Sequence, residues 1–144
     1  MRANRLNCYP RKPTPNWLEH NLIKRILPAA VWLLFILIAT LTPGKQLPKT
    51  PDVIGFDKLV HFGLFFVLTF LWNRVRLENT RLNKVKFITN YLVFGILIAI
   101  LVEYLQQFIP GRSFDYGDMV ANIMGGTIGT ACFYILHKKQ SSLV

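Results

Sequence analysis

Asp57 and His61 are the first residues whose types and spacing point to chemistry. Because they are four positions apart, a helix would place them on one face, one turn from each other. An aspartate at that distance can orient a histidine and stabilise its charged form, so the pair can act as a general base. Lys58 would add a positive charge beside them. We therefore take His61 and Asp57 as candidate catalytic residues.

Glu103 is the third candidate catalytic residue, because a glutamate in partly apolar surroundings can serve as a general acid. It shares a helical face with Gln106 and Gln107, three and four positions later. Further along the chain, Asp118 and Asn122 are four positions apart. The residues that we expect to bind a ligand share a polar character next to apolar stretches. They are Lys58, Gln106, Arg112, Asp115, Asp118 and Asn122.

These polar residues lie at the ends of four nearly charge-free stretches. Glu103 is the one Asp, Glu, Lys or Arg residue within them. A helix needs about 20 apolar residues to cross a bilayer core, and the stretches are residues 26–44, 59–73, 87–111 and 119–137. We therefore expect an all-α bundle of four transmembrane helices, at about residues 26–42, 57–73, 87–109 and 118–136.

The composition combines strong apolarity with strong basicity. Of the 144 residues, 52% are hydrophobic, and the formal net charge is +10. Thirteen of the 17 Lys and Arg residues lie before the first expected helix, between the second and third, or after the fourth. Because basic loops stay on the cytoplasmic side, both termini are expected to be cytoplasmic in a multi-pass protein of the cell membrane. The charge thus indicates topology, and we expect no nucleic-acid partner.

Three segments follow from this topology. Residues 1–25 are expected to form a basic cytoplasmic tail, residues 26–137 the transmembrane domain, and residues 138–144 a C-terminal cytoplasmic tail. Pro28 suits the first turn of the first helix, where its missing N–H costs nothing. An outer loop at residues 45–56 would follow that helix.

Antiparallel threading brings the polar ends of three helices to one depth. The second helix would begin, the third end and the fourth begin on the outer side. The candidate residues of all three helices therefore meet within the outer leaflet and suggest one site. We expect no chain of polar residues to continue inward, which argues against proton-coupled transport.

Small residues recur every four positions along the fourth helix. This pattern lets two membrane helices approach closely, so we expect helix packing there. The residues concerned are Ala121, Gly125, Gly126 and Gly129.

A structural role would explain the same polar residues. Glu103 could pair with His61, Lys58 or Arg112, because charges inside a membrane commonly pair with one another. A metal site of His61, Glu103 and Asp118 is a variant, but one histidine and several carboxylates select no particular metal. We therefore expect neither a metal nor another cofactor.

Three segments resemble the VanZ-like family of small bacterial membrane proteins. They are Asp-Lys-Leu-Val-His-Phe at residues 57–62, Glu-Tyr-Leu-Gln at residues 103–106, and Arg-Ser-Phe-Asp-Tyr-Gly-Asp-Met-Val-Ala-Asn at residues 112–122. The resemblance covers about residues 26–136. It implies an integral membrane protein of the cell envelope, similar to one whose presence lowers susceptibility to teicoplanin. It brings no known reaction.

Three functions agree with these observations. The site could recognise a phospholipid, a lipid-linked cell-wall precursor or a lipoglycopeptide, with Arg112 as the anion partner and Lys58 in support. It could instead be a membrane-embedded hydrolase or transferase that acts on a lipid-linked substrate, with His61 as base and Glu103 as acid. As a third alternative, the protein is a structural or transport subunit. The oligomeric state stays open.

Overall fold

A computed structural model describes residues 16–43, 55–75 and 84–141 of the chain. The first 15 residues of the expected tail, nearly all of the expected outer loop, the basic loop at residues 76–83 and the end of the C-terminal tail lie outside these ranges. The described part consists of helices and their connections, without a strand.

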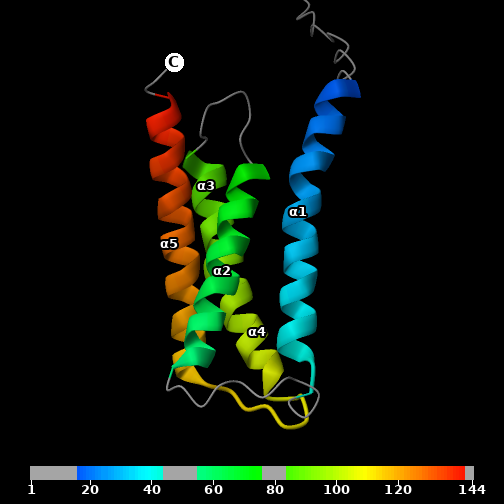
Figure 1. Ribbon diagram of the computed structural model, residues 1–144, viewed down its shortest axis with the longest axis vertical. Coiled ribbons are helices and arrows are strands. Elements are labelled where there is room, and N and C mark those ends of the chain that lie inside the picture. Colours follow the sequence, from blue (N-terminus) through cyan, green and yellow to red (C-terminus); the bar gives the residue numbers. More distant parts are fainter. Residues whose placement is uncertain (1–15, 44–54, 76–83, 142–144) are drawn as a thin grey trace, which may run out of the picture.

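The helices run up and down one bundle (Figure 1). In chain order they are α1 (Asn16–Leu41), α2 (Phe56–Val75), α3 (Lys84–Asn90), the π-helix η2 (Tyr91–Leu97), α4 (Ile98–Gln106) and α5 (Tyr116–Ser141). Four of the described stretches are long and apolar enough to cross a membrane: Ile23–Leu41, Phe56–Val75, Lys84–Gln106 and Tyr116–Lys139. The expected all-α architecture, with four helices long and apolar enough to cross a membrane, is thus confirmed.

The first helix begins well before its expected start. It includes Lys24 and Arg25, because long basic side chains at a helix end can reach the polar headgroup region. Pro28 therefore lies inside α1, and its expected place in the first turn is wrong. The proline removes one backbone hydrogen bond, a loss that membrane helices tolerate.

The third span contains the π-helix η2 in its middle. Gly95 lies there against α5, since a Cβ on Gly126 would be 2.9 Å from the Gly95 Cα. Tyr91 covers Gly95 from the preceding turn and exchanges a hydrogen bond of 2.9 Å with the Thr127 hydroxyl. A π-helix is rare and is often found near functional sites.

Helix α5 packs directly on the backbone of α2, as the two neighbouring ribbons of Figure 1 show. A Cβ on Gly125 would clash with the Phe62 carbonyl oxygen, and one on Gly129 would clash with that of Phe66. The glycine residues of α5 therefore allow an approach that no larger residue permits.

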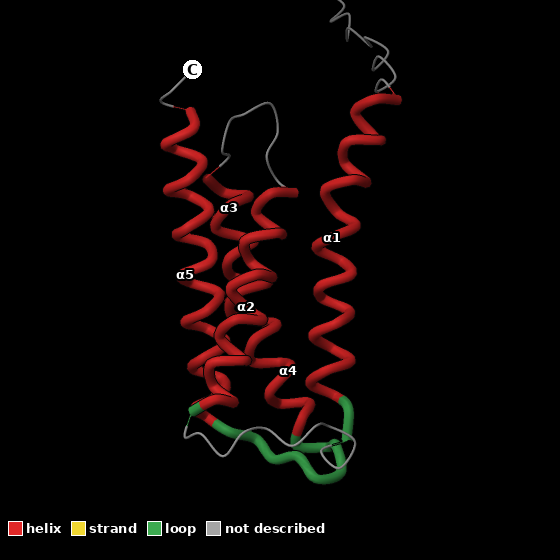
Figure 2. Tube along the Cα trace, viewed as in Figure 1, coloured by secondary structure: helices red, strands yellow, loops and turns green. Residues whose placement is uncertain are grey.

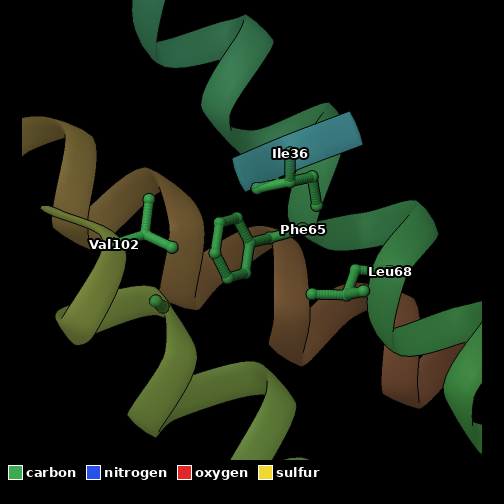
Figure 3. Close-up of a cluster of buried hydrophobic side chains, with 5 residues drawn as sticks. Ile36, Phe65, Leu68 and Val102 are labelled. Atoms are coloured by element: carbon green, nitrogen blue, oxygen red, sulfur yellow. The ribbon is translucent and has the colours of Figure 1, made fainter. Parts of the chain in front are cut away.

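A small apolar core joins α1, α2 and α4. Its members are buried side chains that converge from these helices (Figure 3): Ile36, Phe65, Leu68, Ala99 and Val102. Trp32 also ties α1 to α2, because its Nε1–H donates to the Leu64 carbonyl at 2.9 Å. Figure 2 shows the described loops at one end of the bundle, where α1 and α4 end and α2 and α5 begin. We call this the site end.

Candidate functional site

The site end holds the polar residues that the sequence analysis expected to meet. Helix α2 contributes its first turns, α4 its last turn, α5 its first turns, and the connection between α4 and α5 lies beside them (Figure 1). The side chains of His61, Glu103, Asp118 and Asn122 are buried there, whereas Lys58 is exposed. We call these four buried side chains the floor of the site, and the exposed Lys58 and Asp115 its rim.

His61 lies at the centre of the floor. Its Nδ1 is 3.1 Å from Asn122 Oδ1, a hydrogen bond between α2 and α5. Its Nε2 lies 3.8 Å from Asp57 Oδ1 and 3.9 Å from Asp118 Oδ2. The expected pair of Asp57 and His61 is therefore extended by two residues of α5, which place a second carboxylate and an amide against the ring.

Lys58 bridges two carboxylates at the rim. Its Nζ is 3.0 Å from Asp118 Oδ1 and 3.1 Å from Asp115 Oδ2. The lysine chain crosses Gly117, where a Cβ would lie 2.5 Å from the Lys58 Cε. A glycine at this position lets the ammonium reach both partners.

Asp115 forms an Asx turn before α5. Its Oδ1 accepts a hydrogen bond of 2.6 Å from the Gly117 N–H. This N–H, and then the Lys58 ammonium, hold the pKa of the Asp115 carboxyl below its usual value. Asp115 therefore stays ionised and keeps Lys58 paired at neutral pH.

Glu103 is fully buried and is held by the backbone. Its Oε1 accepts a hydrogen bond of 2.9 Å from the Asp115 N–H. Its Oε2 has no hydrogen-bond partner among the described residues. Nor does Glu103 form an ion pair with His61, Lys58 or Arg112 within that part of the chain. In the described residues, Glu103 is thus held by a backbone N–H and not by one of these ion pairs.

Two of the expected ligand-binding residues face α1 instead of His61. The Arg112 guanidinium donates from Nη2 to the Ala39 carbonyl at 3.2 Å and from Nε to the Thr42 carbonyl at 3.5 Å. Gln106 donates to the Thr40 carbonyl at 3.1 Å. These carbonyls end a helix and lack intrahelical partners, so a cation beside them is favourable. Both side chains anchor the end of α1.

Buried polar residues also continue away from the site end, contrary to expectation. Thr69 donates to the Gly126 carbonyl at 3.0 Å, and Asn73 donates to the Thr130 hydroxyl at 3.3 Å. Asn90 reaches the Trp72 carbonyl at 3.3 Å. The spacing of four positions between Thr69 and Asn73 could have indicated this in the sequence. These side chains are neutral, and they connect neighbouring helices by hydrogen bonds.

Three described residues could hold a metal ion. Asp57, His61 and Asp118 each offer one ligand atom, and these atoms lie within 4.8 Å of one another. Glu103, which the sequence analysis placed in such a set, is not part of this group.

Comparisons with known proteins agree with this architecture. The model of the VanZ/LLP1 family matches residues 3–137, a longer range than the resemblance in the sequence indicated. "Uncharacterized protein C11E3.10" of Schizosaccharomyces pombe is 28% identical over 127 residues, which cover 88% of this chain and 73% of the yeast protein. No solved structure matches the chain. Since the family match covers nearly its whole length, the chain belongs to the VanZ/LLP1 family.

Proposed function

We propose that this protein recognises the polar headgroup of an amphiphile at the outer face of the cell membrane. The amphiphile is a phospholipid, a lipid-linked precursor of the cell envelope or a lipoglycopeptide. The observation that carries the proposal is the buried floor under an exposed rim. His61, Glu103 and Asp118 are only 4%, 0% and 5% exposed, and buried ionisable groups near the end of a membrane span are costly to keep without a function.

Apolar residues beside the rim support a lipid as the ligand. Leu59 follows Lys58 and is 64% exposed, and Tyr116 at the start of α5 is 73% exposed. A lipid tail that lies along Leu59 would bring its headgroup to the height of Lys58. A tyrosine at this depth suits the interface, because its ring is apolar and its hydroxyl is polar.

The charges of the site favour a headgroup that is not a bare anion. Asp115 and Asp118 pair with the ammonium of Lys58, and Asp57 adds a third carboxylate beside His61. Arg112, the expected anion partner, is bonded to α1. A headgroup with amine or hydroxyl groups next to a phosphate matches this mixture of charges. The relative in a yeast favours a phospholipid, which bacterial and yeast membranes share.

In this proposal both termini lie in the cytoplasm, so the site opens to the exterior. Antibiotics that act on the outer surface would then meet the lipid that the protein holds. We expect lower susceptibility to teicoplanin as the phenotype, because the lipid that the protein holds is altered in its contact with the antibiotic.

A matched pair of lysine variants tests the proposal. The full chain is purified in mild detergent, and the lipids that remain bound are identified by mass spectrometry. Lys58→Gln should lose the bound lipid at least about ten-fold, whereas Lys138→Gln, at the opposite end of α5, should retain it. Equal retention by both variants, at equal thermal stability, would refute recognition at this site.

The surroundings of His61 favour one second candidate, a hydrolase or transferase that acts on a lipid-linked substrate. Asn122 fixes one ring nitrogen, so the other faces Asp57 and Asp118 and can accept a proton from water or a hydroxyl. Glu103 has one carboxylate oxygen without a partner in the described part of the chain. This candidate fails if His61→Asn and Glu103→Gln both retain the full phenotype in cells.

A further inference from the structure

We infer that Asp57, His61 and Asp118 bind one divalent metal ion, which supplies a positive charge for the phosphate of the headgroup. The role of the ion rests on the proposed function, but its binding does not. The three ligand atoms lie within 4.8 Å of one another, in the first turns of α2 and α5.

The ring orientation of His61 suits a metal ligand. A histidine that binds a metal through one nitrogen usually donates the proton of the other to an oxygen. Here Nδ1 faces Asn122 Oδ1 at 3.1 Å, which leaves the Nε2 lone pair directed at Asp57 and Asp118. In the neutral ring this lone pair faces two carboxylates, an arrangement that either a metal ion or a proton on Nε2 stabilises.

The distances agree with an ion between these groups. Nε2 is 3.8 Å from Asp57 and 3.9 Å from Asp118, beyond hydrogen-bond length. In a tetrahedral site with bonds of about 2.1 Å, two ligand atoms lie about 3.4 Å apart, so an ion would draw each carboxylate toward Nε2 by about 0.5 Å. Asp57 is exposed, so a small rotation of its side chain can close the remaining gap between the two carboxylates.

Lys58 and Asp115 orient Asp118 from outside the group. Asp118 directs Oδ1 to the Lys58 ammonium and Oδ2 to His61. The ammonium is shared with Asp115, so its charge is offset there. The three carboxylates and the ammonium leave two negative charges around His61, which a divalent ion would neutralise.

Two unpaired buried atoms belong to residues near the three proposed ligands. Glu103 Oε2 and Asn122 Nδ2 have no hydrogen-bond partner among the described residues, although both side chains are fully buried. Asn122 contacts His61 directly, and Glu103 lies within electrostatic range of His61 and Asp118. Such atoms are costly to bury. A water molecule on a bound ion could donate to the glutamate oxygen, and a headgroup oxygen could accept from the asparagine amide.

The donor atoms select the kind of ion. One imidazole nitrogen and two carboxylates suit Zn²⁺ or Mn²⁺, whereas Mg²⁺ and Ca²⁺ prefer oxygen ligands alone. Three protein ligands leave at least one position open, as in catalytic zinc sites. A phosphate oxygen of the headgroup can take that position.

Metal titration of the full chain tests this inference. Protein in detergent is stripped with a chelator, dialysed against Zn²⁺ or Mn²⁺, and analysed for bound metal. We expect about one ion per chain. Asp57→Asn and His61→Gln should weaken binding at least ten-fold, in the range found when groups at a metal site are lost.

A matched control separates this site from adventitious binding. His137→Gln makes the same chemical change as His61→Gln, but near the other end of α5 and outside the three proposed ligands. This variant should retain the ion. Absence of stoichiometric binding, undiminished binding by Asp57→Asn, or equal binding by His61→Gln and His137→Gln would overturn the inference. Asp57 is exposed, so its variant stays informative if His61→Gln does not fold.

Lipid retention with and without chelator distinguishes this inference from the proposed function. Retention that a chelator abolishes supports both. Unchanged retention in chelator refutes the role of the ion and leaves headgroup recognition standing. Metal binding without any lipid retention leaves the metal site standing and refutes the proposed function.

Discussion

Glu103 accepts a hydrogen bond from the backbone N–H of Asp115 through Oε1, at 2.9 Å. This bond joins the end of α4 to the connection before α5, and Asp115 in turn pairs with Lys58. The second oxygen of Glu103 has no partner in the described part of the chain. One carboxylate oxygen thus holds the fold, and the other is free for a proton or a ligand.

Two substitutions of Glu103 separate these roles. Glu103→Gln keeps an oxygen for the Asp115 N–H and removes a buried charge, so we expect equal or higher thermal stability in detergent. Glu103→Ala leaves that N–H unpaired, at a cost of about 1–3 kcal/mol. If Glu103 acts on a ligand, the glutamine variant loses lipid retention while it remains stable. A glutamine variant as unstable as the alanine variant would make the role purely structural.

Arg112 is expected to support stability more than recognition. Arg112→Ala removes the donors to the Ala39 and Thr42 carbonyls, so α1 loses an anchor worth about 1.5–3 kcal/mol. Thermal unfolding in detergent should show a lower midpoint, with lipid retention unchanged per folded molecule. Loss of lipid at unchanged stability would instead return Arg112 to the headgroup site.

Arg112 also shows which part of the structure could be predicted from the sequence and which part could not. The charge-free runs predicted four spans because a long apolar helix has few other places to go, and antiparallel threading then predicted that Asp57, Glu103 and Asp118 meet. Sequence does not reveal how each helix is rotated about its axis. The partners of Arg112 are backbone carbonyls of a distant helix end, which no side-chain pattern marks.

The π-helix η2 could not be predicted from the sequence for a related reason. Its residues are uniformly apolar from Leu92 to Leu97 apart from Gly95, so no polar face records the number of residues per turn. The early start of α1 was missed because Lys24 and Arg25 suggested a loop, although basic side chains at a helix end can extend to the headgroups.

Because α5 packs closely on α2, we expect a single methyl group added to a glycine of α5 to lower the free energy of unfolding strongly. Gly125→Ala and Gly129→Ala would force a Cβ onto the carbonyl oxygens of Phe62 and Phe66, so we expect a loss of about 1–3 kcal/mol in unfolding free energy. Gly63→Ala is the control, because a Cβ there meets no atom within 4 Å and alanine favours a helix by about 1 kcal/mol. Equal destabilisation by all three variants would contradict close packing of α5 on α2.

Cysteine labelling in cells tests the predicted orientation. Cys8 and Cys132 are first replaced by serine, and Ser113→Cys or Lys138→Cys is then introduced. Both new positions are exposed, the first at the site end and the second near the opposite end of α5. Because thirteen of the 17 basic residues mark the cytoplasmic side, a thiol reagent that does not cross membranes should label position 113 in intact cells. Position 138 should react only after permeabilisation. The reverse pattern would place Lys58 and His61 on the cytoplasmic side and refute recognition of an outer-leaflet lipid.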